Sequence, residues 1–401
     1  MKLFPKLLIA ICLLSSCRAE EADQFPVIVQ YNDLEVGAAR TDIYLPLLKD
    51  KKIAIVANHT SLIKGMHTVD KLIDLNLNVQ KVFSPEHGFR GNKSDGALIN
   101  DQKDKKTGLP IISLYGSHKK PTPEDLSKID VVVFDIQDVG VRFYTYLSTM
   151  TFIMEACAEN NIPVVIFDRP NPNGFYVDGP ILESEFKSFV GMHPVPIVHG
   201  MTPGEYALMV NGEGWLKNEV KCDLSIIKVK KYSHLQTMDL PVKPSPNLPT
   251  FSSVLLYPSL ALFEGTVVSI GRGTSFPFQV AGHPEFSDRV FSFTPKSIPG
   301  ASINPPLKNQ QCFGIDLRIR ISEETFISKK IELKWIQQLY EEIGSKTDFF
   351  SAYFYKLTGQ KKLRQQIMDG LSEKEIRQTW QKELKRYKKI RAKYLLYPDF
   401  K

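Results

Sequence analysis

A glutamate and a histidine lie side by side in the stretch FSPEHGFRG, which covers residues 83–91. Glu86 offers a carboxyl group that can give or take a proton, and His87 offers an imidazole that can assist it or bind a metal ion. Pro85 and Gly88 on either side of the pair predict a rigid corner in the backbone. These residue types fit a satisfied turn, a metal site or a catalytic acid, and the motif alone does not choose among them.

Other polar residues that could do chemistry follow apolar runs of the chain. Their amides suit hydrogen bonding to a ligand, arginine suits an anionic group, and tyrosine can stack on a sugar ring or pack in a core. Asp135 ends one such run and could act on a ligand or orient a neighbour. The candidate binding residues in the first half are Asn58, His59, Gln137, Arg142, Tyr144, Tyr146, Asp168 and Arg169.

The stretch HGMTPGE, residues 199–205, has two interpretations. Thr202, Pro203 and Glu205 occupy the N-cap, first and third positions of a predicted helix, which is a complete capping box with proline at the first position. That box explains Glu205 without catalysis. His199 lies just before the cap, on a loop that could still reach a cleft, so both residues stay candidates.

The second half of the chain adds four candidates. Ser245 and Asn247 lie in a stiff, proline-rich loop. Glu264 and Arg272 stand next to glycines, which permit close approach of the backbone to a ligand. Arg272 could clamp a carboxylate, because the guanidinium fork matches that geometry, or it could form a salt bridge within a turn.

The elements that must position these residues follow from the apolar pattern. Five runs, at residues 52–57, 79–83, 110–115, 130–136 and 163–168, are rich in β-branched residues and mostly continuous, which predicts parallel strands covered on both faces. Residues 68–75 and 141–160 are predicted helices. This order predicts a Rossmann-like α/β fold in which polar clusters after four of the strands converge on one edge. No G-x-G-x-x-G follows the first run, so we predict no dinucleotide and no other cofactor.

A second region begins at the proline-dense stretch of residues 241–250. A strand at 314–321, a helix at 333–343 and a long helix from the Ser372–Glu375 capping box to about residue 393 are predicted beyond it. We therefore expect a Rossmann-like catalytic domain at residues 35–240 and a smaller α+β domain at residues 241–401.

The N-terminus has the features of a secretion signal. Residues 1–6 are basic, residues 7–14 are apolar but too short to span a bilayer, and Leu-Ser-Ser precedes Cys17. We expect a lipoprotein signal peptide at 1–16, lipidation of Cys17, a tether at 17–34 and a place in the bacterial cell envelope, at the periplasmic face or the cell surface. An ordinary secretory signal is the alternative.

The bulk composition fits a globular protein and excludes two other classes. The chain has 401 residues, 43% of them hydrophobic, and a net charge of +7. No basic patch interleaved with aromatic residues supports nucleic-acid binding. Beyond the signal, Cys157, Cys222 and Cys312 are odd in number and far apart, so they form no disulfide framework, and Cys157 is expected to be a core thiol.

Taken together, the motifs resemble one family. The order is NHT, FSPEHGFRG, TGLPIISLYG, VVVFDIQDVGVRFYTY, FDRPNP, HGMTPGE, PSPNLPT, LFEGT and GRGTSFPF, and the resemblance runs from about residue 35 to the C-terminal YLLYPDF. The chain resembles the NamZ-type exo-β-N-acetylmuramidases. That resemblance implies an active site in a cleft between two domains and release of terminal β-linked N-acetylmuramic acid (MurNAc) from the non-reducing ends of peptidoglycan-derived MurNAc-GlcNAc oligosaccharides, for cell-wall recycling. Glu86 is the best match to the family's catalytic carboxylate.

The chemistry of glycoside hydrolysis agrees with this expectation. Glu86 would protonate the leaving oxygen, with His87 as its helper, and Glu205, Glu264 or Asp135 would be the second carboxylate unless the 2-acetamido group of the sugar takes that part. Arg142, Arg169 or Arg272 would bind the lactyl carboxylate.

Two alternatives to this hydrolase stay open. One is a non-catalytic sugar-binding lipoprotein. The other is a metal-dependent hydrolase using His59, His87, Asp135 and His199, although no metal-binding motif supports it, and we predict no metal.

Overall fold

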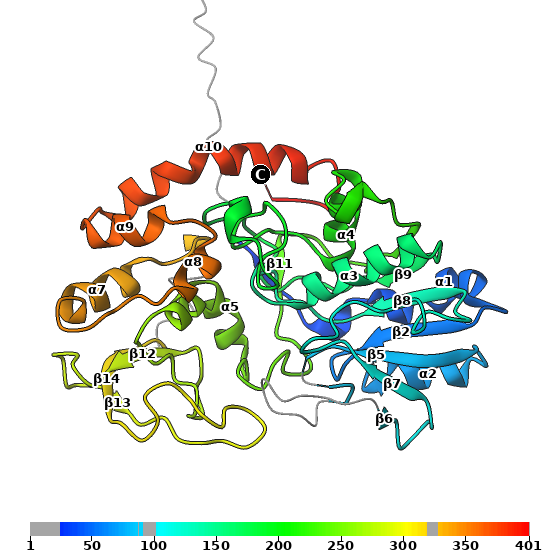
Figure 1. Ribbon diagram of the computed structural model, residues 1–401, viewed down its shortest axis with the longest axis horizontal. Helices are drawn as coiled ribbons and strands as arrows, with labels where there is room; N and C mark the ends of the chain where they lie inside the picture. Colours follow the sequence, from blue (N-terminus) through cyan, green and yellow to red (C-terminus); the bar gives the residue numbers. More distant parts are fainter. Residues whose placement is uncertain (1–24, 87, 91–101, 319–327, 401) are drawn as a thin grey trace, which may run out of the picture.

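The computed structural model describes residues 25–86, 88–90, 102–318 and 328–400. Its centre is a seven-stranded sheet with the order β10-β9-β8-β2-β5-β7-β6, in which all neighbours are parallel except β6 and β7 (Figure 1). The strands are β2 (Ile53–Ala57), β5 (Val79–Ser84), β6 (Gln102–Lys103), β7 (Pro110–Ser113), β8 (Val131–Asp135), β9 (Val164–Phe167) and β10 (Leu224–Ile227). The predicted Rossmann-like parallel sheet is confirmed.

The chain order of the parallel strands is that of a dinucleotide-binding sheet. Counted along the chain, the six strands lie in the order 3-2-1-4-5-6, and the order reverses between β2 and β8. All five residues of β2 and all five of β8 are buried, because both faces of the sheet are covered. The carboxyl ends of β5, β2, β8 and β9 therefore meet at one edge, as the sequence predicted.

Helices cover the two faces of the sheet. Alternate residues of the strands pack into two clusters: one contains α1 (Thr41–Leu48) and α2 (Thr68–Asp74), and the other contains α3 (Tyr146–Glu159) and α4 (Pro203–Gly212). Helix α3 begins later than predicted, because the backbone of Val141 and Arg142 pairs with Ile197 and Val198 instead of turning into the helix. Cys157 of α3 is fully buried, as expected of a core thiol.

The second lobe is smaller and mixes helices with a short antiparallel sheet (Figure 1). The sheet has the order β12 (Val280–His283), β14 (Cys312–Asp316) and β13 (Ser292–Phe293). The predicted strand at 314–321 is thus placed two residues earlier, and residues 319–321 lie outside the described residues. The helices of this lobe within the described residues are α5 (Phe251–Leu260), α7 (Lys334–Ile343), α8 (Tyr353–Thr358), α9 (Lys362–Met368) and α10 (Glu373–Arg391).

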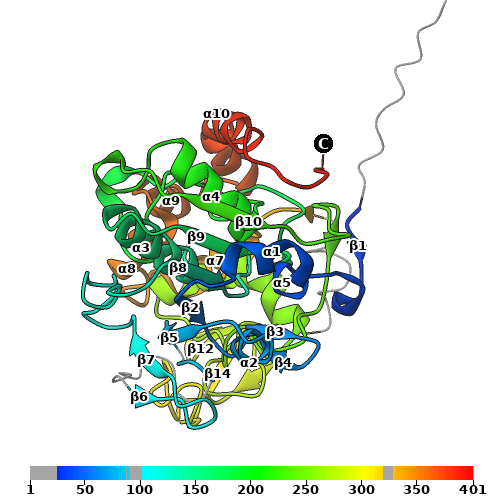
Figure 2. The ribbon, with the colours of Figure 1, turned by 90° about the vertical axis from the view of Figure 1, so that its right-hand side faces the viewer.

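Helix α10 begins at the predicted capping box of Ser372 and Glu375 and runs across both lobes (Figures 1 and 2). At its end, the Tyr387 hydroxyl donates to the carbonyl of His199, and the Arg391 guanidinium donates to that of Gly200. One hydrophobic cluster extends from strands β2 and β8 to helices α5, α7 and α10. The two lobes therefore share a continuous core.

Shorter elements complete the chain. Strands β1 (Val27–Ile28) and β11 (Gln236–Thr237) form a parallel pair, and β3 (Leu62–Ile63) and β4 (Met66–His67) an antiparallel one. The 3-10 helices are η1 (Tyr31–Asp33), η2 (Gly37–Ala39), η3 (Ser184–Phe186), η4 (Lys217–Glu219) and η5 (Ala261–Gly265). Among the described helices, none combines the length and the apolarity that crossing a membrane requires.

Candidate active site

A cavity of about 580 Å³ lies between the carboxyl edge of the sheet and the second lobe. Both halves of the chain contribute to it. The predicted site residues in its wall are Glu86, Tyr144, Tyr146, Ser245, Asn247, Glu264 and Arg272. Because these residues span some 190 positions of the sequence, only the folded chain brings them together.

Glu86 stands on a tight turn at the end of β5. The carbonyl of Pro85 accepts a hydrogen bond from the Gly88 N–H (3.2 Å), and Gly88 has a φ of 79°, a value that favours glycine. The Ser84 carbonyl accepts from the Leu114 N–H (2.8 Å), which ties the turn to the end of β7. The sequence-predicted corner is thus present and projects a half-buried Glu86 into the cavity. His87 lies outside the described residues.

Ion pairs anchor the chain just beyond this turn. Arg90 bridges Asp70 (3.0 Å) and Asp104 (2.8 Å), and Lys106 joins Asp70 (2.7 Å). The hydrogen bond from Arg90 lowers the pKa of Asp104 to about 2. The corner that carries Glu86 is therefore held at its strand end by the sheet and at its far end by an ionic network.

Tyr144 and Tyr146 form an aromatic wall beside Glu86. Their rings meet edge to face with centroids 5.0 Å apart, and the Tyr144 hydroxyl donates to the carbonyl of Pro244 (2.6 Å). Burial raises the pKa of Tyr146, and the charge of Glu86 raises it further. A side-chain hydrogen bond with Asn58 acts on that pKa in the opposite direction. Tyr146 lines the cavity beside Glu86, whereas Asn58 is fully buried and lies outside the described wall.

The second lobe supplies another carboxylate. Glu264, in η5, forms an ion pair with Arg272 (2.5 Å), and the Arg272 guanidinium lies 5.4 Å from the centre of the Phe278 ring. Next to this pair, the Ser245 hydroxyl accepts from the Asn247 N–H (3.2 Å), which stiffens the loop as predicted. Glu86 and Glu264 are the two carboxylates in the described wall of the cavity.

Asp135 does not contact the cavity. Its two oxygens accept hydrogen bonds from Arg169 at 2.6 Å and 2.9 Å, and both side chains are almost fully buried. Arg169 also donates to Tyr31 and to the carbonyl of Leu62. Burial lowers the pKa of Arg169, but the Asp135 carboxylate outweighs it and raises that pKa overall. The structure therefore places Asp135 and Arg169 together inside the protein, outside the described wall of the cavity in which they were expected to act.

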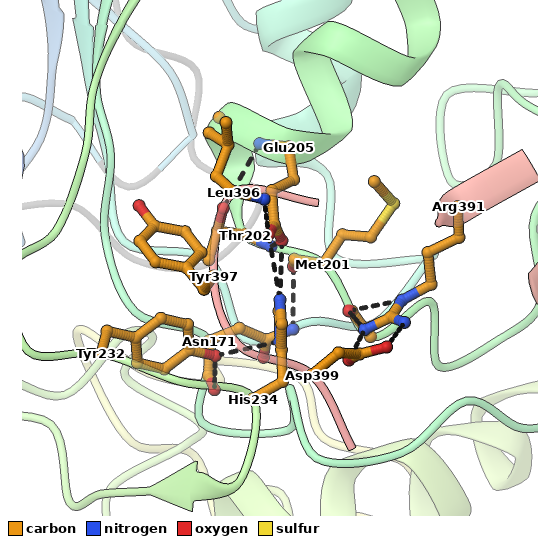
Figure 3. Close-up of polar contacts among 12 residues, drawn as sticks. Asn171, Met201, Thr202, Glu205, Tyr232, His234, Arg391, Leu396, Tyr397 and Asp399 are labelled. Atoms are coloured by element: carbon orange, nitrogen blue, oxygen red, sulfur yellow. Dashed lines mark hydrogen bonds and ion pairs between the residues drawn. The ribbon is translucent and has the colours of Figure 1, made fainter. Parts of the chain in front are cut away.

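Glu205 is likewise occupied inside the protein (Figure 3). It accepts from the Thr202 N–H (2.9 Å), completing the predicted capping box, from His234 Nε2 (2.9 Å) and from the Leu396 N–H (2.8 Å). Its side chain is 0% exposed. The predicted capping box is confirmed, and the structure places Glu205 inside the protein, outside the described wall of the cavity.

Six further predicted residues lie outside the described wall of this cavity, and the fully buried Asn58 is one of them. Asp168 caps α4 through Thr202 and Gly204 and accepts from Tyr397, and Arg142 donates to three backbone carbonyls. The others are Gln137, bonded to two backbone carbonyls, His59, bonded to the carbonyl of Lys243, and the fully buried His199. The hydrogen bonds that these residues make are to the protein itself, and none of them lines this cavity.

We expect His199 to behave as a buried neutral base. Burial lowers its pKa to about 3, and unfolding restores the ordinary value of about 6.5. Because the folded pKa is the lower one, the contribution to stability is present above pH 6.5 and is lost as the pH falls toward 3. Between pH 7 and pH 5, the free energy of unfolding of wild type should fall by about 2 kcal/mol more than that of His199→Asn, measured with urea.

The comparison with His199→Asn is needed because other buried groups change the free energy of unfolding in the opposite direction as the pH falls. Burial raises the pKa of Asp138 to about 7 and that of Asp168 to about 6, so these carboxyls favour the folded state as the pH falls. Asparagine can still accept from the Met201 N–H, as His199 Nδ1 does. The same pH dependence in both proteins would show that His199 is not held neutral.

Eleven residues in the described wall of the cavity were not predicted as site residues, and four of them carry large polar or aromatic side chains from segments outside the predicted clusters. Tyr115 and Lys119 follow β7, and Phe189 and Tyr353 come from distant segments. The strand-end rule could have found the first two, because Tyr115 ends the predicted run at residues 110–115 and Lys119 follows it closely. No local signal marks Phe189 or Tyr353.

Among the described residues, no three His, Cys, Asp or Glu side chains are grouped so as to hold a metal ion. Of the residues of the metal-dependent alternative, His59, Asp135 and His199 are separately engaged, and His87 is not described. The described geometry therefore gives that alternative no support.

A Rossmann-like sheet facing a second lobe, with two glutamates and aromatic rings around the cavity between them, has the parts of a glycoside hydrolase. Models of the exo-β-N-acetylmuramidase NamZ family match the chain, the N-terminal one at residues 53–252 and the C-terminal one at residues 255–397. The chain belongs to this family.

Individual relatives agree with that assignment. The chain is 40% identical over 374 residues to the peptidoglycan β-N-acetylmuramidase NamZ of Bacillus subtilis, which covers 88% of this chain and 89% of the relative. A crystal structure of a DUF1343 family protein from Bacteroides fragilis is 47% identical, with a TM-score of 0.86 over 92% of this chain and 99% of that one. A second from the same organism is 28% identical, with a TM-score of 0.75 over 91% and 99%.

Proposed function

We propose that this protein is an exo-acting glycoside hydrolase that releases terminal β-linked MurNAc from the non-reducing ends of peptidoglycan fragments. Family membership and the named activity of the Bacillus subtilis relative support the proposal. The observation that carries it is the cavity, because Glu86 and Glu264 face one space lined by tyrosines and phenylalanines. Carboxylates supply the acid–base chemistry of glycoside hydrolysis, and aromatic rings suit the faces of a sugar.

We propose separate parts for the two carboxylates of the described wall. Glu86, on its rigid corner, protonates the leaving oxygen. Glu264 comes from the second lobe, and its ion pair with Arg272 orients it. It can therefore activate water or stabilise the oxocarbenium-like centre. The 2-acetamido group of the sugar is the other candidate for that stabilising part. Asp135 and Glu205 drop out of the mechanism, since their oxygens are engaged within the fold.

The deciding experiment follows wild-type protein with a MurNAc-GlcNAc disaccharide by NMR. We expect free MurNAc to appear, and the anomer that forms first reports retention or inversion. A GlcNAc-MurNAc disaccharide, with the other sugar at the non-reducing end, is the matched control and should persist. Binding of MurNAc-GlcNAc without turnover would refute the hydrolase and favour a sugar-binding lipoprotein.

We further propose that the protein is a lipoprotein of the bacterial cell envelope that serves cell-wall recycling. The basic start, the short apolar run and Leu-Ser-Ser before Cys17 support this location, in a segment outside the described residues. The expected result is that wild type sediments with membranes in its bacterial host, whereas Cys17→Ala is recovered in the soluble fraction. Equal distribution of the two proteins would contradict lipidation of Cys17.

A further inference from the structure

We propose that Lys119 selects N-acetylmuramic acid by binding the carboxylate of its lactyl group. The inference rests on the function proposed above and identifies the residue that recognises the negative charge of the substrate. MurNAc differs from GlcNAc by a lactyl ether on the sugar ring, which carries a negative charge. A site that prefers MurNAc therefore needs a cation within reach of that ether, in a cavity that already holds two glutamates.

The three arginines that the sequence offered for this task are occupied. Arg142 donates to the carbonyls of Pro180 (2.9 Å), Val195 (2.7 Å) and Leu357 (2.8 Å) and is buried away from the cavity. Arg169 forms an ion pair with Asp135, and both side chains are almost fully buried. Arg272 reaches the cavity but forms its 2.5 Å ion pair with Glu264 there.

Lys119 is in a different situation. It lines the cavity, and in the described part of the chain its ammonium group makes no ion pair or hydrogen bond. The ammonium lies 4.6 Å from the centre of the Phe189 ring, which stacks on Phe152 at 6.0 Å. A cation–π contact of this kind orients the lysine and leaves its hydrogen-bond donors for an anion.

The neighbours of Lys119 hold it in place. His118 contacts Asp125 (2.9 Å), and Lys120 pairs with Glu159 (2.7 Å) and Glu155 (3.5 Å). Residues on both sides are therefore tied to the protein body. The loop after β7 presents Lys119 to the cavity on a fixed backbone, which reduces the entropy lost when an anion binds.

The charges in the described wall favour the same assignment. Glu264 and Arg272 form an ion pair, so Lys119 is the other cation in the described wall. A lactyl carboxylate that enters a cavity with two glutamates is repelled by any of them that is ionised. Lys119 offsets that repulsion from its place beside the Phe189 ring.

Lys119→Met tests the inference with two chromogenic β-glycosides, one of MurNAc and one of its lactyl methyl ester. We expect kcat/KM for the MurNAc substrate to fall about 10- to 100-fold, mainly through KM, because one charge-assisted contact is lost. The lactyl methyl ester carries no negative charge for Lys119 to bind. Its kcat/KM should therefore change by less than about threefold in the variant. Lys120→Met, whose lysine pairs with Glu159 outside the cavity, is the matched control and should leave both values near wild type.

Two outcomes would overturn the assignment. Equal losses on both substrates, with a shifted pH profile, would mean that Lys119 acts on the protonation of Glu86 instead of on the lactyl group. An unchanged kcat/KM for the MurNAc glycoside would mean that Lys119 does not contact the substrate.

If wild type hydrolyses neither glycoside, the proposed hydrolase fails, and calorimetry with free MurNAc and free N-acetylglucosamine (GlcNAc) then tests the role of Lys119 in binding. A wild-type preference for MurNAc that Lys119→Met abolishes would uphold its role, and no such preference would refute it.

Discussion

Glu86→Gln is expected to abolish nearly all turnover of a MurNAc-GlcNAc disaccharide while the protein folds normally. Glutamine keeps the shape of the side chain, and the Pro85–Gly88 turn does not depend on the carboxyl group. It cannot give a proton, and loss of a positioned general acid costs about 10²- to 10⁴-fold in rate. The disaccharide depends on that proton, because its leaving group is a sugar alcohol of high pKa.

A second substrate separates proton donation from other roles of Glu86. A chromogenic MurNAc glycoside with an acidic phenol as leaving group needs little protonation, so Glu86→Gln should lose much less activity on it. Equal losses on both substrates would rule out Glu86 as the acid and point to a nucleophile or a binding group. Glu124→Gln, at an exposed position, is the control for the substitution itself and should match wild type.

Asp135→Asn is expected to destabilise the protein by about 3–5 kcal/mol, because it leaves the Arg169 guanidinium buried without a counter-charge. The double variant Asp135→Asn/Arg169→Met should recover part of this loss, since it removes both charges together. Urea unfolding gives the free energies. The folded fraction should keep turnover within about threefold of wild type, because neither residue lines the cavity.

An exposed ion pair is the control for the stability changes of the Asp135 and Arg169 variants. Glu185 contacts Lys361 at 2.9 Å on the surface, and Glu185→Gln should produce no measurable change in stability. If Asp135→Asn were as stable as wild type yet inactive, Asp135 would return as a catalytic residue, and its pairing with Arg169 would be incidental.

Much of the scaffold could be predicted from local patterns. The five β-branched runs became β2, β5, β7, β8 and β9, because strands buried on both faces leave a continuous apolar signature. The capping boxes at Thr202 and Ser372 were also visible, since their hydrogen bonds join residues three positions apart. Strand β10, with the sequence LSII, was not predicted, and three of its four residues are only half-buried.

The candidate site was also predicted only in part from the sequence. Sequence order placed Glu86 after a buried strand on the edge where ligands bind, and the glycine-flanked motifs marked Glu264 and Arg272. Their position in one cavity agrees with that interpretation. Lys119 was not predicted although it follows a predicted strand, because a lysine in the polar stretch GSHKK looks the same in sequence as a solvated surface charge.

The sequence by itself determined which elements form and which polar residues end the strands, because these depend on near neighbours in the chain. Only the tertiary structure decided which of those residues are free to act. Asp135 is engaged by Arg169, 34 positions away, and Glu205 by Leu396, 191 positions away. A buried carboxylate must find hydrogen-bond partners wherever the fold brings them, and no local pattern records which partner it finds.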